Sequence, residues 1–251
     1  MSMNLRPDLE QLPPRLRKLP IDARGYPVPW FVAWVPGPDG VDVPEFRAMD
    51  AQKFRDAVKQ RLCWVCGEPL GRWLAFPIGA MCVITRTISE PPSHRECAEW
   101  SIRNCPFLNN PRAVRDHADV PADARAPAGF GIERNPGVAC LWMTREYELF
   151  RDGRGGALIT IGKPEGVTWW REGRAATRAE VDEAIASGLP ILLAAARRDG
   201  RFAVEALETQ VIAARAFLPI DRHESPPSVD AVREDVASPV VPLREKASSS
   251  S

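Results

Sequence analysis

Several short stretches of the chain have the apolar pattern that β-strands require. Residues 30–35 alternate large apolar side chains between two faces, which predicts a strand. Pro27 and Pro29 lack N–H groups, so this strand must begin at the edge of a sheet. Residues 138–144 and 157–161 are apolar runs typical of buried strands, and the glycine-rich turn before the second predicts that they pair as a hairpin with a long connection.

Apolar residues spaced three or four positions apart predict three helices elsewhere. The first follows Asp50, a suitable N-cap residue. The second begins with Thr177 and Glu180, which together match the capping-box pattern, and should end at residues 188–190, Gly-Leu-Pro. The third covers residues 202–217. With the strands, these helices predict a small mixed α+β protein.

Proline-rich and polar stretches without periodicity divide the chain into five predicted segments. Neither end carries enough apolar surface to offset the entropy of ordering it, which predicts disordered termini. The segments are a disordered N-terminus (1–18), an N-terminal half (19–108), a linker or long loop (109–129), a C-terminal α+β half (130–219) and a disordered tail (220–251).

Composition excludes several classes of protein. The 251 residues carry 33 Lys+Arg and 33 Asp+Glu, so the formal net charge is zero and the chain is not a strongly basic nucleic-acid binder. No apolar run approaches the about 18 residues of a membrane span. The start of the chain lacks the apolar core of a secretory signal, so the expected compartment is the cytoplasm. Six cysteines in such a chain indicate metal binding or catalysis rather than disulfides.

Two cysteine-containing motifs form a complete set of zinc ligands. Cys63 and Cys66 make a CxxC pair followed directly by glycine, the sequence of a zinc knuckle. His94 and Cys97 make an HxxC pair further along. Three sulfur ligands and one nitrogen ligand are what a tetrahedral structural zinc requires, which predicts one Zn²⁺ per chain. Cys105 is an alternative fourth ligand in place of His94.

The sequence between and around these pairs predicts a treble-clef-like zinc module over residues 61–108. Residues 73–76 and 81–85 are short apolar runs separated by Pro-Ile-Gly-Ala, which reads as a β-hairpin. Ser93 and Glu96 have capping-box spacing, so a helix should begin at His94 and carry the second ligand pair. The order of knuckle, hairpin and helix is that of a treble-clef zinc finger.

The sequence shows no recognisable catalytic constellation. A nuclease built on a similar frame needs a histidine on the hairpin to activate water, and none lies between Cys66 and His94. An enzyme with its active site between the two halves is still an alternative. Its candidate groups are Glu68, Cys105 and Glu133, although no spacing rule selects them.

Nucleic-acid binding is a second possibility, because the zinc region is mildly positive. Its candidate contacts are Arg86, Arg95 and Arg103. Phosphate neutralisation by several cations drives most such affinity, so a mild charge only permits this function. The alternative interpretation is that these arginines simply form a solvated surface with no nucleic-acid partner.

Five motifs together resemble an uncharacterised family of bacterial and phage-encoded proteins that has a CxxC…HxxC treble-clef-like module. They lie at residues 26–31, 63–71, 91–99, 105–108 and 135–138. The resemblance covers residues 15–217 and implies that both halves form one unit, but it implies no activity. The sequence therefore predicts a cytoplasmic protein with a structural zinc site that binds a protein or nucleic acid, with an enzyme as the alternative.

Overall fold

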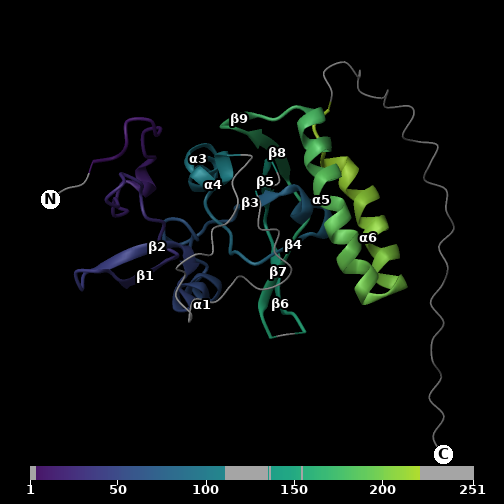
Figure 1. The fold of residues 1–251 in the computed structure, drawn as a ribbon, viewed down its shortest axis with the longest axis horizontal. Coiled ribbons are helices and arrows are strands. Elements are labelled where there is room, and N and C mark those ends of the chain that lie inside the picture. Colours follow the sequence, from purple (N-terminus) through teal and green to yellow (C-terminus); the bar gives the residue numbers. More distant parts are fainter. Residues whose placement is uncertain (1–3, 111–134, 136, 154, 221–251) are drawn as a thin grey trace, which may run out of the picture. The chain divides into compact units, whose positions relative to one another are not determined.

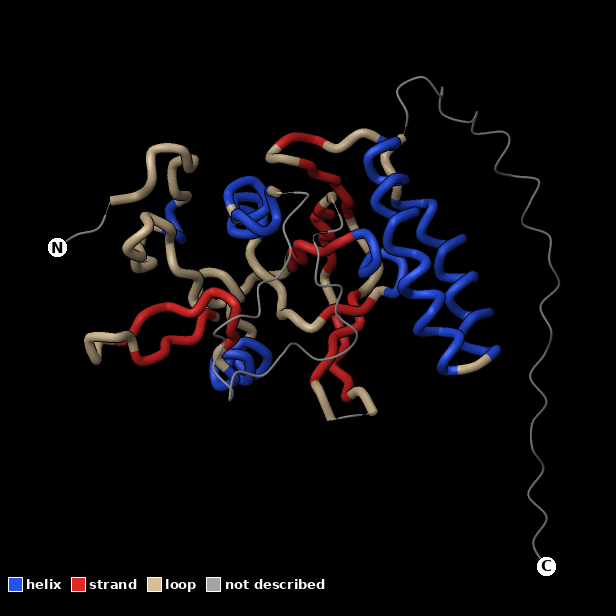
Figure 2. Tube along the Cα trace, in the orientation of Figure 1, coloured by secondary structure: helices blue, strands red, loops and turns tan. Residues whose placement is uncertain are grey.

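The chain folds into a mixture of helices and antiparallel strands, drawn in Figures 1 and 2. This computed structural model describes residues 4–110, 135, 137–153 and 155–220. The helices are α1 (Ala51–Gln60), α2 (Ala80–Thr85), α3 (Arg95–Asn104), α4 (Pro106–Asn109), α5 (Arg178–Asp199) and α6 (Arg201–Ala214). The strands are β1 (Val32–Pro36), β2 (Asp42–Met49), β3 (Leu74–Gly79), β4 (Thr87–Ile88), β5 (Ala139–Thr144), β6 (Tyr147–Arg151), β7 (Ala157–Ile161), β8 (Gly166–Arg171) and β9 (Arg174–Ala175). Two 3-10 turns, η1 (Pro14–Leu16) and η2 (Arg215–Phe217), complete these elements, and the α+β class is confirmed.

Strands from both predicted halves pair with each other. One sheet has the order β3-β5-β8-β9, and Phe76 of β3 lies opposite Trp142 of β5. A second sheet has the order β4-β7-β6, while β1 and β2 form a separate two-stranded sheet. The described residues up to Pro219 belong to one compact unit. None of the described helices is both long and apolar enough to span a membrane.

The predicted hairpins at 73–85 and between 138–144 and 157–161 are wrong. Residues 80–85 form helix α2 rather than a strand, and β3 pairs with β5. Pro77 lies inside β3 instead of in a turn, which is possible because β3 is the end strand of its sheet and proline needs no ladder partner there. Strand β7 pairs with β6 and β4 rather than with β5.

The largest apolar core joins the two larger sheets to helices α2, α5 and α6, and α5 and α6 lie side by side in Figure 1. The capping box at Thr177 and Glu180 is confirmed at the start of α5. The predicted end of this helix at residues 188–190 is wrong, because α5 continues through Pro190 to Asp199. A Cβ on Gly188 would lie 2.7 Å from the sulfur of Met81, so this glycine lets α5 approach α2 closely.

The N-terminal segment is ordered over its described residues, 4–18, where the sequence predicts disorder. Leu16 is completely buried, and Leu19 is nearly so. Both belong to the same buried apolar cluster as the three cysteines of the predicted metal site. Leucines at intervals of three or four residues form the apolar side of this stretch that faces the cluster, and they are Leu9, Leu12, Leu16 and Leu19.

Two other predicted segments lie largely outside the described residues. The predicted linker at 109–129 is described only as far as residue 110. The predicted tail at 220–251 is described only at Ile220.

Candidate metal centre

The first ligand pair lies in a tight turn closed by backbone hydrogen bonds. The N–H group of Cys63 donates to the carbonyl oxygen of Glu68 at 2.7 Å, and the N–H group of Gly67 donates to that of Cys63 at 2.8 Å. Gly67 has a φ of +74°, a conformation that glycine adopts without steric cost. The turn therefore directs both thiols of the CxxC pair to one side, as in a zinc knuckle.

The second ligand pair is positioned by strand β3 and helix α3. Ser93 pairs with Ala75 of β3 through two backbone hydrogen bonds of 2.8 and 2.9 Å, so it is extended. The predicted capping box at Ser93 is consequently not formed, and His94 is the N-cap residue of α3. Cys97 follows in the first turn of this helix, where the sequence placed it.

The four predicted ligands converge on one point. The ligand atoms of Cys63, Cys66, His94 and Cys97 all lie within 4.8 Å of one another. Nδ1 of His94 is 3.4 Å from Sγ of Cys66 and 3.9 Å from Sγ of Cys97. Tetrahedral zinc with ordinary bond lengths separates sulfur and nitrogen ligands by about 3.6 Å. The described side chains therefore fit a zinc ion, and this group includes His94 rather than the alternative ligand Cys105.

Groups around the four ligands orient them. The N–H groups of Cys66 and His94 point at Sγ of Cys63, at 3.5 and 3.3 Å. Nε2 of His94 lies 3.1 Å from the carbonyl oxygen of Pro69, to which it can donate. A donating Nε2–H leaves Nδ1 unprotonated in the neutral ring, and Nδ1 is the nitrogen that faces the sulfurs.

The ionisation of the cluster also suits a cation. Burial alone would raise the pKa of Cys63, but hydrogen bonds with Cys66, Cys97 and His94 outweigh it and hold the pKa far below its ordinary value. Hydrogen bonds with the sulfurs of Cys63 and Cys66 raise the pKa of His94 to about 10. The same two sulfurs raise the pKa of Cys97 far above its ordinary value. The crowded sulfurs therefore hold protons between them, which a divalent ion would displace.

The N-terminal segment covers the centre and is fastened there by ion pairs. Arg15 pairs with Glu68 of the knuckle and, at 2.8 Å, with Glu96 of helix α3. Lys18 also pairs with Glu68, at 2.6 Å. The three cysteines of the cluster are at most 2% exposed under this cover. This cover is not among the structures predicted from the sequence, although the leucine spacing in residues 9–19 is a signal for it.

The candidate groups for catalysis do not form a second site among the described residues. Glu68 is held by Arg15 and Lys18. Cys105 is the N-cap residue of α4, and burial raises the pKa of its thiol. Glu133 lies outside the described residues.

The three candidate nucleic-acid contacts each have protein partners. Arg95 pairs with Glu99 at 2.7 Å, and Arg103 pairs with Glu10 at 2.9 Å. Arg86 stacks on the Trp142 ring, with 4.2 Å from its guanidinium carbon to the ring centroid, and donates to the backbone. Burial lowers the pKa of Arg86. Nucleic-acid contact through these arginines stays a prediction, and their pairing weakens it.

Comparisons of the chain with protein family models, with curated proteins and with solved structures found no match. The resemblance to a bacterial and phage-encoded family is therefore not supported beyond its metal-binding motifs. The Cys/His cluster is the part of that resemblance that the structure contains.

Proposed function

We propose that this chain is a zinc-binding protein in which one Zn²⁺ ion is structural. The observation that carries the proposal is the closed Cys₃His set, because four protein ligands leave no position for a substrate or a reactive water. The ligands belong to two separate segments, and the N-terminal segment packs over them. The ion would thus hold three parts of the chain together. Thiolate ligands persist in a reducing compartment, which supports a cytoplasmic location.

The proposed role of the zinc-stabilised protein is to bind another protein. Its net charge is zero, and the arginines near the metal centre are paired with carboxylates. Nucleic-acid binding usually depends on cations that are free to neutralise several phosphates. The pairing therefore favours a protein partner over a nucleic acid. The ion pair of Glu68 with Arg15 and the raised pKa of the buried Cys105 thiol disfavour the enzyme alternative.

Metal analysis of matched variants tests the structural zinc. Elemental analysis of the purified protein should find about one zinc per chain, and removal by a chelator should unfold the region around the centre. The Cys97→Ser variant should lose the metal. Cys82→Ser is the control, because it also removes one thiol but lies outside the cluster. A metal-free wild-type protein with unchanged unfolding behaviour would refute the proposal.

Affinity capture tests the class of partner. The wild-type chain should retain a protein partner after nuclease treatment, and Cys97→Ser should not. Recovery of nucleic acid that disappears with nuclease, together with binding that falls steeply as salt increases, would instead establish the nucleic-acid function.

A further inference from the structure

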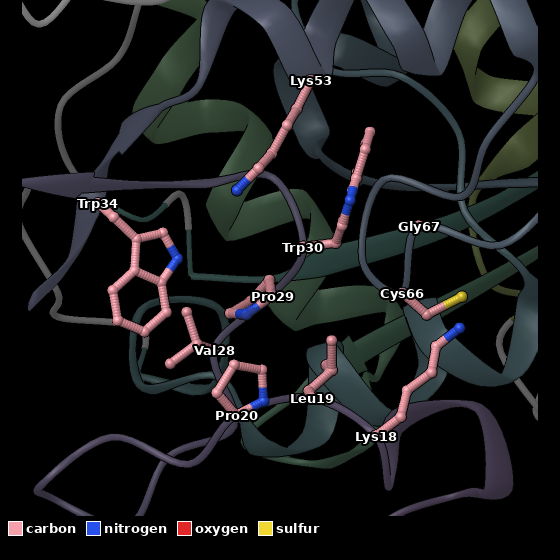
Figure 3. A pocket seen from close by; sticks show the side chains of 10 residues that line it. All are labelled: Lys18, Leu19, Pro20, Val28, Pro29, Trp30, Trp34, Lys53, Cys66 and Gly67. Atoms are coloured by element: carbon pink, nitrogen blue, oxygen red, sulfur yellow. The ribbon is translucent and has the colours of Figure 1, made fainter. Parts of the chain in front are cut away.

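A pocket lies directly beside the metal centre, with a volume of about 340 Å³. Its walls come from four parts of the chain, shown in Figure 3: residues 18–20, the β1 region at 28–34, Lys53 of helix α1, and the knuckle residues Cys66 and Gly67. This volume is in the range of small ligand sites and would accept one or two side chains of a peptide.

The apolar walls of the pocket are held in place by the knuckle and by residues before strand β1. The N–H group of Trp30 donates to the carbonyl oxygen of Val65 at 2.7 Å. The Trp30 ring lies so close to Gly67 that a Cβ there would be 2.6 Å from it. Val28 is 1% exposed and is held by a hydrogen bond of 2.7 Å to Pro20. These walls are thus formed before any ligand arrives, which reduces the entropy lost on binding.

Two features of the pocket remain open to a ligand. Trp34 is 42% exposed although it is a large apolar side chain on a strand. The Lys53 side chain extends toward the region between the two tryptophans in Figure 3. Its ammonium group donates to the carbonyl oxygen of Val32 at 2.9 Å and is 3.9 Å from Asp50, so one of its three N–H bonds can serve a ligand.

The charge of the lining is one-sided. Lys18 and Lys53 both line the pocket, and none of its lining residues is acidic. Lys18 is already paired with Glu68 at 2.6 Å, so Lys53 is the cation that faces a ligand. The ligand that complements such a surface carries a negative charge beside an apolar group.

We propose that this pocket binds an acidic peptide segment of a partner protein, with an apolar side chain against Trp34 and an adjacent carboxylate at Lys53. The inference rests on the proposed binding function and names the chemistry of the partner. A peptide fits better than a nucleic acid, because two lysines with carboxylates nearby at Glu68 and Asp50 suit one or two charges rather than a run of phosphates.

Titration of the full chain with three blocked peptides, followed by NMR of the tryptophan indole N–H groups, tests this proposal. The acidic probe is acetyl-Gly-Asp-Phe-Glu-Gly-amide. Its isosteric neutral control replaces Asp and Glu by Asn and Gln, and its polar control replaces Phe by Gly. The Trp34→Ala variant assigns the Trp34 signal and removes the apolar contact. Lys53→Met removes the charge, and Lys59→Met on the same helix is the matched control because it does not line the pocket.

The acidic probe should shift the Trp34 signal with a dissociation constant of about 0.1–1 mM, and each control peptide should bind at least about tenfold more weakly. Lys53→Met should weaken the acidic probe about tenfold and leave the neutral one unchanged, whereas Lys59→Met should change neither. Equal binding of the acidic and neutral probes, no binding at all, or tighter binding of a short oligothymidylate would each overturn the proposal. Zinc content is measured on the same samples. A protein that contains zinc but does not bind the acidic probe refutes the peptide site alone, whereas a protein without zinc refutes the proposed structural zinc.

Discussion

Replacing Gly67 with alanine probes how tightly the knuckle and the pocket wall are joined. Two effects add at this position. A left-handed φ of +74° costs an L-residue about 1–2 kcal/mol. The new Cβ would also lie 2.6–2.9 Å from three atoms of the Trp30 ring. That ring cannot move freely, since it packs edge-on against Trp64 and the backbone N–H group of Trp30 donates a hydrogen bond to the carbonyl oxygen of Val65.

Overpacking of this kind typically costs about 1–3 kcal/mol, so the Gly67→Ala variant should lose about 2–5 kcal/mol of unfolding free energy. The assay is urea unfolding followed by tryptophan fluorescence at a fixed zinc concentration. Two variants separate the effects. Gly40 has a φ of +72° with nothing near its missing Cβ, so Gly40→Ala should show the backbone cost alone.

Gly71 is the control for the substitution itself, since a Cβ there meets nothing and its φ is not left-handed. Gly71→Ala should change the stability by less than about 0.5 kcal/mol. If Gly67→Ala were no less stable than Gly40→Ala, the close contact between the knuckle and Trp30 would carry no energy, and the reasoning about a fixed pocket wall would be refuted.

Two further predictions concern the cover of the metal centre and a helix terminus. Leu16→Ala should cost about 2–5 kcal/mol and speed zinc transfer to a coloured chelator, because Leu16 is fully buried on the cluster. Leu149→Ala, at a side chain that is 47% exposed, should change neither quantity. A hydrogen bond from Arg174 lowers the pKa of Glu180 to about 2. The stability that this carboxylate adds is therefore fully present above pH 4.5 and lost as the pH falls toward 2, so the difference in unfolding free energy between wild type and Glu180→Gln should shrink over that interval. A difference independent of pH would contradict that assignment.

The Cys/His cluster could be predicted because the sequence information for each ligand pair is local. Each ligand pair lies within one turn of the chain, and a cysteine or histidine side chain has few other roles in such spacing. The starts of helices α1 and α5 could be predicted for the same reason. The side chains of Asp50 and Thr177 accept hydrogen bonds from N–H groups only two or three positions away.

The strand partners could not be predicted, because they depend on distant residues. An apolar run such as 74–79 could pair with a neighbouring strand in a hairpin or with a distant strand in a larger sheet. Which pairing forms depends on β5, which begins at Ala139. The structure around Pro190 and around the N-terminal leucines also depends on distant residues. Tertiary packing of α5 on α2 overrides the helix-breaking tendency of proline, and burial of Leu16 against the cysteines orders a segment that would have no core by itself.

The two ligand pairs flank strand β3, and this arrangement bears on the order in which the chain folds. A metal ion bound by the four side chains closes the loop that contains β3 and brings Ser93 beside Ala75. The partner strand β5 begins at Ala139, so its pairing with β3 closes a longer loop than metal capture does, at an entropy cost that grows slowly with loop length. Metal capture can precede that pairing, since it needs only residues 63–97. An ion bound first would hold β3 between the two ligand pairs before β5 pairs with it.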